Sequence, residues 1–173
     1  MAALFRSADR GRGRWVFAAV ALACVAAVGA ALVSQHVFDM QPCPWCVLQR
    51  VIYLAIAIAC GIGLLWRSAI GRRVSAGLGL LLALAGVAAA LWQHFQAATS
   101  ASCKQTLADK IVSGWLQLDS LWPDVFSARA SCADAAVSLL GISYDLWSLA
   151  LFVIIGVAFL VLLRRRVSLA TWR

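Results

Sequence analysis

Two cysteines separated by two residues, Cys43 and Cys46, are the side chains in this sequence best suited to chemistry. They stand in the stretch QPCPWCVLQR, at positions 41–50. A pair with this spacing serves disulfide exchange, a structural disulfide, haem attachment or zinc binding. Haem attachment requires a histidine directly after the second cysteine, where this chain has Val47. The spacing therefore disfavours haem and leaves the other three chemistries to be weighed.

Zinc would need four ligands, which Cys43, Cys46, Cys103 and Cys132 have the donor atoms to supply. Structural zinc sites usually combine two knuckles of closely spaced ligands. Cys103 and Cys132 are far apart in the sequence. We therefore predict no metal site, and thiol exchange and structural disulfides remain.

The composition places these cysteines in a membrane protein. Of 173 residues, 64% are hydrophobic and 13% are charged, and the mean hydropathy is +0.89. A soluble protein of this composition would expose far more apolar surface than soluble proteins do. A bilayer core is crossed by roughly 20 apolar residues in a helix, and four segments qualify: 15–34, 47–66, 74–92 and 146–163. We predict an all-α protein, a bundle of four transmembrane helices in a single membrane domain, residues 1–173.

The net charge of +8 is distributed in a way that indicates topology and not nucleic-acid binding. Basic residues gather before the first span, between the second and third, and after the fourth. They are Arg6, Arg10, Arg12, Arg14, Arg67, Arg72, Arg73, Arg164, Arg165, Arg166 and Arg173. With four spans these clusters fall on one side, which the positive-inside rule makes cytoplasmic. We expect both termini to be cytoplasmic, outward loops at residues 35–46 and 93–145, and a lipid bilayer, without nucleic acid, as the surroundings.

This topology separates the six cysteines into two groups. The outward loops contain Cys43, Cys46, Cys103 and Cys132, and the spans contain Cys24 and Cys60. An outward compartment is oxidising and permits disulfides, so the first group forms two pairs in one of three connectivities, which the spacing leaves open. The second group is expected to fill the apolar core.

The segment that follows Cys43 is expected to be helical from its first proline. Proline suits the first turn of a helix, so we predict a helix start near Pro44 or Trp45. Cys46 then lies in the first turn, where the positive helix end stabilises a thiolate. Arg50 stands one turn deeper on the same face. An arginine at that depth is costly unless it has a task, and the alternative is a side chain that reaches back to the outer headgroups.

Two further segments carry structural expectations. Glycines in the third span, at positions 77, 79 and 86, predict close helix packing in lipid, and a tight loop through Gly71 is expected before it. In the second outward loop, Ile111, Trp115, Leu118 and Trp122 would form one apolar stripe if the segment is helical. Such a stripe either lies in the headgroup layer or packs on the rest of the loop. Pro123 should end or kink this helix.

Taken together, these features resemble the disulfide bond formation protein B (DsbB) family. The resemblance rests on PCPWCVLQR entering the second span, on Gln35 and His36 before it, and on GRGRW before the first span. It also rests on the four-span plan with two further cysteines in the second outward loop, so it covers essentially the whole chain. It implies a four-helix bundle in the bacterial inner membrane that oxidises the periplasmic dithiol protein DsbA and passes the electrons to a membrane quinone.

The resemblance also implies roles for individual residues. Cys43 and Cys46 correspond to the quinone-proximal pair, with Cys46 as the thiolate that contacts the quinone ring. Cys103 corresponds to the position that forms the mixed disulfide with the partner, and Cys132 to the one that exchanges with Cys43. Arg50 matches an arginine that helps to hold the quinone. The resemblance also places His94 near the same site.

We therefore expect a protein-dithiol:quinone oxidoreductase with its active cysteines on the periplasmic side. Ubiquinone is the expected cofactor, with menaquinone as the alternative. Gln49 stands where the family pattern can have a glutamate, a difference that bears on redox potential or quinone affinity. One alternative is a related membrane thiol oxidoreductase with a dedicated partner, such as one resembling vitamin K epoxide reductase. Another is a non-enzymatic membrane assembly protein with two structural disulfides.

Overall fold

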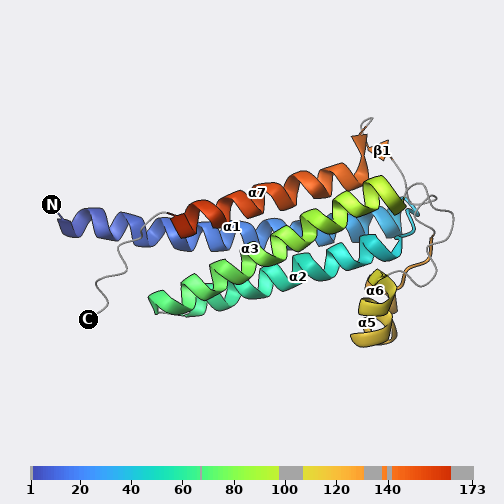
Figure 1. Ribbon diagram of the computed structural model, residues 1–173, viewed down its shortest axis with the longest axis horizontal. Coiled ribbons are helices and arrows are strands. Elements are labelled where there is room, and N and C mark those ends of the chain that lie inside the picture. Colours follow the sequence, from blue (N-terminus) through green and yellow to red (C-terminus); the bar gives the residue numbers. More distant parts are fainter. Residues whose placement is uncertain (1, 67, 98–106, 131–137, 140–141, 165–173) are drawn as a thin grey trace.

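Four long helices lie side by side in the computed structural model, which describes residues 2–66, 68–97, 107–130, 138–139 and 142–164 (Figure 1). They are α1 (Ala2–Val37), α2 (Pro44–Leu65), α3 (Ala69–Trp92) and α7 (Tyr144–Arg164). Each contains a stretch long and apolar enough to cross a membrane, namely Gly13–Val37, Pro44–Leu65, Ile70–Phe95 and Asp145–Arg164. The prediction of a helical bundle with four membrane-spanning segments is confirmed.

The short elements gather at one end of this bundle (Figure 1). Helix α3 continues into a π-helical turn, η1 (Gln93–Ala97). The second loop contributes α4 (Leu107–Asp109), the π-helical η2 (Lys110–Trp115), α5 (Leu118–Leu121) and α6 (Pro123–Phe126). Strands β1 (Ser138–Leu139) and β2 (Ile142–Ser143) pair antiparallel directly before α7. The start of α1 and the end of α7 lie at the opposite end.

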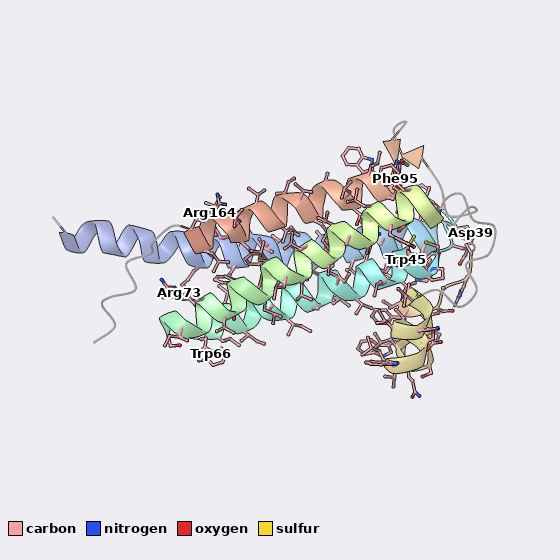
Figure 2. All side chains as sticks on the ribbon, viewed as in Figure 1. Asp39, Trp45, Trp66, Arg73, Phe95 and Arg164 are labelled. Atoms are coloured by element: carbon pink, nitrogen blue, oxygen red, sulfur yellow. The ribbon has the colours of Figure 1, made fainter. Side chains whose placement is uncertain are left out.

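The bundle is held together by an apolar interior that every long helix helps to fill. Helix α2 packs between α1 and α3, and α3 packs against α7. The largest fully buried side chains include Phe17, Ile56, Phe152 and Phe159. Many large apolar side chains point outward along the helices (Figure 2). An apolar outer surface over an apolar core is the pattern of a helix bundle that faces lipid.

Glycines in α3 bring this helix close to α7, as the sequence predicts. A Cβ atom at Gly79 would stand 2.5 Å from the Phe159 ring, and one at Gly86 would stand 2.4 Å from the Phe152 ring. Gly77 has open space around it. Two of the three glycines therefore create the close approach, because only a residue without a side chain leaves room for the phenylalanines.

The prediction of a loop through Gly71 is wrong, because α3 already begins at Ala69. Ser68 caps α3, since its hydroxyl oxygen accepts a hydrogen bond of 3.1 Å from the Gly71 backbone N–H. Gly71 is therefore in the first turn of α3. A Cβ atom there would meet the Trp66 ring at 2.6 Å, so this glycine allows the connection between α2 and α3 to be short.

The single amphipathic helix considered for the second loop does not form. Gln117 adopts a left-handed backbone conformation with φ of 47° and separates η2 from α5. Pro123 starts α6 after α5 has ended, as expected. Trp115 and Trp122 are exposed. The second loop packs on Val47 of α2 through Val112 and Phe126, and Leu118 of the predicted stripe packs against this small cluster.

Candidate thiol redox site

Cys43 and Cys46 flank the start of α2, as the sequence predicts. Pro44 is the first residue of this helix, and Cys43 is its N-cap, with extended backbone. The Cys43 Sγ accepts a hydrogen bond of 3.3 Å from the Cys46 backbone N–H, which satisfies one of the free donors of the first turn. The two Sγ atoms lie 2.7 Å apart as free cysteines. The helix start therefore places two thiols in position to form or open a disulfide.

The two cysteines differ in environment. Cys43 is fully buried, whereas Cys46 is partly exposed. The hydrogen bond to Cys46, burial, and the charge of Cys46 all raise the pKa of Cys43 above its ordinary value. When the pair is reduced, Cys43 is therefore disfavoured as a thiolate.

Two glutamines at the ends of α2 and α3 connect to Cys46. Gln93 Nε2 donates a hydrogen bond of 3.3 Å to Cys46 Sγ, and Gln49 Nε2 donates one of 2.8 Å to Gln93 Oε1. Sequence reasoning singled out Gln49 as a difference from the family pattern but missed Gln93. The available signal was a polar residue directly before His94 at the outer end of an apolar span.

Arg50 is buried inside the protein, with 5% of its surface exposed. Its Nη1 donates hydrogen bonds to Gln35 Oε1 (2.7 Å) and to the Val125 carbonyl oxygen (2.9 Å). Its Nη2 donates to the Ala31 carbonyl oxygen (3.3 Å). The alternative in which Arg50 reaches back to headgroups is thus excluded, and its guanidinium joins α1 and α6 to α2.

The second loop is held against the start of α2 by further bonds. Gln35 Nε2 donates to the Asp124 carbonyl oxygen at 3.0 Å. The backbone N–H groups of Arg129 and Ala130 both donate to the Pro42 carbonyl oxygen, at 3.0 and 3.3 Å. Residues 124–130 therefore run past the residue that precedes Cys43.

Cys103 and Cys132, the other predicted redox pair, lie outside the described residues. Ala130, which precedes Cys132 by two positions in the sequence, is the last described residue before it.

His94 lies next to Gln93 but contacts a different partner. Its Nδ1 is 2.6 Å from Asp145 Oδ2, at the start of α7, and its ring meets the Phe95 ring edge to face. Gln93 and His94 both lie in the π-helical turn η1. Gln93 contacts Cys46 of α2, and His94 contacts Asp145 of α7. His36 is exposed at the end of α1.

Aromatic side chains border the cysteine pair. Trp45, between the two cysteines, packs against Trp92 with ring centroids 6.3 Å apart. Trp45 Nε1 is buried and has no hydrogen-bond partner among the described residues. A buried donor without a partner is unusual in proteins, and this one lies at the sequence position directly before Cys46.

Comparison with known proteins identifies the family of this chain. The family described as disulfide bond formation protein DsbB matches residues 13–162. Disulfide bond formation protein B of Herminiimonas arsenicoxydans is 33% identical over 144 residues, covering 83% of this chain and 90% of the relative. Disulfide bond formation protein B 1 of Pseudomonas savastanoi pv. phaseolicola is 39% identical over 137 residues, covering 78% and 79%. The chain belongs to the DsbB family and is a multi-pass membrane protein that acts in disulfide bond formation.

Proposed function

We propose that this protein re-oxidises a DsbA-like periplasmic dithiol protein by disulfide exchange and passes the electrons to a membrane quinone. The observation that carries the proposal is the Cys43 and Cys46 pair at the start of a membrane-spanning helix, with sulfurs 2.7 Å apart and unequal exposure. In disulfide exchange one sulfur is attacked and the other leaves as a thiolate. The different surroundings of Cys43 and Cys46 suit such a division of roles, whereas a structural disulfide does not require it.

The relay begins in the second loop. The partner's thiolate attacks Cys103 of a Cys103–Cys132 disulfide, a new bond forms to Cys103, and Cys132 leaves as a thiolate. Cys132 then attacks Cys43, which forms a Cys43–Cys132 bond, breaks the Cys43–Cys46 bond and releases Cys46 as a thiolate. The hydrogen bonds from Arg129 and Ala130 to Pro42 support this second step, since they hold the chain near Cys43.

The partner's second thiolate attacks the mixed disulfide, which releases the oxidised partner and frees Cys103. Cys103 attacks Cys132, which restores the Cys103–Cys132 bond and frees Cys43, and a bound quinone would take the two electrons given up when the Cys43–Cys46 bond forms again.

The surroundings of Cys46 suit a quinone. A planar ring with carbonyl acceptors is complemented by the Trp45 and Trp92 rings and by the unpartnered Trp45 Nε1. A quinone bound there would accept two electrons and two protons, and ubiquinone is the expected species, with menaquinone as the alternative. DsbA is a strong oxidant at about −120 mV, so a more oxidising acceptor is needed to drive its re-oxidation. Arg50 supplies positive charge one turn below Cys46, and His94, next to Gln93 in the sequence, is proposed to lie near the same quinone.

The same proposal places the protein in the bacterial inner membrane with these cysteines facing the periplasm. The oxidising compartment lies on that side, and the arginine clusters of the sequence are expected on the cytoplasmic side. Arg73 and Arg164 lie toward the other end of the bundle, away from Asp39, Trp45 and Phe95 (Figure 2).

Purified protein, a reduced DsbA-type dithiol and a water-soluble ubiquinone provide the direct test. We expect quinone-dependent oxidation of the dithiol. Cys46→Ala should abolish quinone reduction yet still capture the partner as a mixed disulfide at Cys103, whereas Cys24→Ala, which changes a core cysteine, should keep turnover. Full turnover by Cys46→Ala would contradict the relay.

Two other outcomes identify the alternatives. Quinone reduction that requires a different dithiol protein would indicate a related oxidoreductase with a dedicated partner. Cysteines that resist mild reducing agents would indicate structural disulfides, whose potentials typically lie below about −300 mV.

A further inference from the structure

Two hydrogen bonds link Gln49, Gln93 and Cys46 in turn, and both run from donor to acceptor in the direction of Cys46. Gln49 donates to the acceptor end of the Gln93 amide, and the donor end of that amide points at the Cys46 sulfur. A glutamine amide has one carbonyl and one NH₂ group. Engaging its carbonyl therefore fixes which end faces the sulfur. Gln49 determines the orientation of Gln93.

Helix geometry explains why these three side chains meet. Cys46 and Gln49 are three residues apart in α2, so they share a face, and that face packs on α3. Gln93 caps α3, where its backbone N–H bonds to both the Ala89 and Ala90 carbonyl oxygens, and it starts the π-helical turn. Such turns redirect side chains and are frequent at functional sites. Here the turn places Gln93 toward α2 and His94 toward α7.

The hydrogen bond from Gln93 stabilises the Cys46 thiolate more than the neutral Cys46 thiol. A neutral thiol is a weak acceptor, whereas hydrogen bonds to charged acceptors are about twice as strong as neutral ones. Gln49 has only 5% of its surface exposed, so water competes little for its hydrogen bond to Gln93. An amide can stabilise an anion here without adding a second buried charge, which would be costly.

We propose that Gln93 is a catalytic residue that stabilises the thiolate of Cys46, and that Gln49 is a positioning residue that aims it. The proposal rests on the proposed function, since it concerns the sulfur released in the relay. When a thiolate attacks Cys43, the new disulfide forms and the electron pair of the Cys43–Cys46 bond moves to Cys46. The Gln93 N–H meets that charge, and a better-stabilised thiolate leaves faster.

The test uses the reduced full-length protein in detergent, without partner or quinone. The rate of Cys46 alkylation by iodoacetamide is followed against pH by mass spectrometry, and the reduction potential of the Cys43–Cys46 pair is measured against a thiol buffer. Gln93→Leu should move the alkylation midpoint upward by about one pH unit, the size expected when a hydrogen bond to a charged group is lost. The potential should become more negative, because the reduced form loses a stabilising contact.

Three variants distinguish this role from packing. Gln93→Glu keeps the shape but presents a carboxylate to the sulfur, so it should shift the midpoint upward at least as far as Gln93→Leu. Gln49→Leu should shift it in the same direction by a smaller amount. Leu91→Ala, at the same end of α3 and partly exposed, should leave it unchanged.

An unchanged midpoint and potential in Gln93→Leu or Gln93→Glu would overturn the proposal. If Gln93→Leu fails to fold, Gln93→Glu and Gln49→Leu decide the question. Because no partner or quinone is present, a negative result here is distinct from failure of the relay, which the Cys46→Ala turnover assay reports.

Discussion

The two cysteines of the C-x-x-C pair are chemically identical but differ in their place at the helix start. Cys43 is the N-cap and is enclosed by protein, while Cys46 lies inside the first turn and is partly exposed. Because the first turn presents free N–H groups, the pair is asymmetric before any cofactor or partner takes part. The fold therefore gives the two sulfurs different surroundings, and the proposed relay assigns them different roles.

This asymmetry predicts an order of modification. In the reduced protein at neutral pH, iodoacetamide should alkylate Cys46 at least about tenfold faster than Cys43, since the thiolate is the nucleophile and each unit of raised pKa removes a factor of ten in thiolate below that pKa. Alkylation of Cys43 should accelerate at higher pH than alkylation of Cys46, because the hydrogen bond to Cys46 and burial raise the pKa of Cys43.

Peptide mapping by mass spectrometry after timed quenching measures both rates. The buried Cys24 and Cys60 serve as internal controls and should remain unmodified until the protein is denatured. Equal rates for Cys43 and Cys46 would contradict the asymmetry.

For single residues, the sequence predicted the features that depend on neighbours within a few positions. Proline at the first helical position predicts the start of α2, and the helix period predicts that Arg50 follows Cys46 on one face. Gln93 could not be found in this way. Its contact with Cys46 joins residues 47 positions apart and depends on a π-helical turn, for which single-sequence patterns give no signal.

Among the helices, Arg50 connects three: its own helix α2, α1 and α6. It bonds to α1 through Gln35 and Ala31 and to α6 through Val125, and Gln35 also bonds to Asp124. The arginine thus holds the second loop near Cys43, in addition to any contact with a quinone. The two roles predict different behaviour in variants.

Arg50→Met should raise the apparent KM for quinone more than that for the dithiol, and should also loosen the second loop. We expect hydrogen exchange of backbone amides at 118–126 to accelerate roughly tenfold, because a buried arginine hydrogen bond is lost. Gln35→Leu should loosen the same amides while leaving quinone KM much closer to that of the unmodified protein. Unchanged hydrogen exchange at 118–126 in both variants would contradict a role of Arg50 in holding the second loop and leave only its proposed role in binding the quinone.

Packing between α3 and α7 gives a second prediction at this level. Gly86→Ala should lower the free energy of unfolding by about 1 to 3 kcal/mol, the usual range for overpacking, because the added methyl group meets the Phe152 ring. Gly77→Ala, with open space around it, is the matched control and should be neutral or slightly stabilising. Thermal unfolding in detergent measures both, and equal losses would contradict the close approach.

Across the whole molecule, composition predicted the helix bundle. The prediction failed for the second loop, where irregular backbone conformations determine the structure. Four apolar stretches and the glycines of α3 were sufficient to predict the bundle. The stripe of Ile111, Trp115, Leu118 and Trp122 did not form a single helix, because Gln117 adopts a left-handed conformation and η2 is π-helical. Neither feature follows from hydrophobic periodicity.

The ends of the bundle differ in charge as well as in chemistry. The redox site and the short elements lie at one end, and Arg73 and Arg164 lie toward the other (Figure 2). If basic clusters stay cytoplasmic, the molecule can stand in the membrane in only one orientation that exposes Cys46 to an oxidising compartment. Orientation is therefore part of the mechanism and can be tested independently of turnover.

A membrane-impermeant maleimide applied to spheroplasts tests this orientation, with single cysteines introduced in a variant in which all native cysteines are alanine. Ser113→Cys, exposed on η2, should be labelled in intact spheroplasts. Ser7→Cys and Ser168→Cys, near the two termini, should be labelled only after permeabilisation. The reverse pattern would place the active pair in the reducing cytoplasm, where a disulfide relay of this kind would not be sustained.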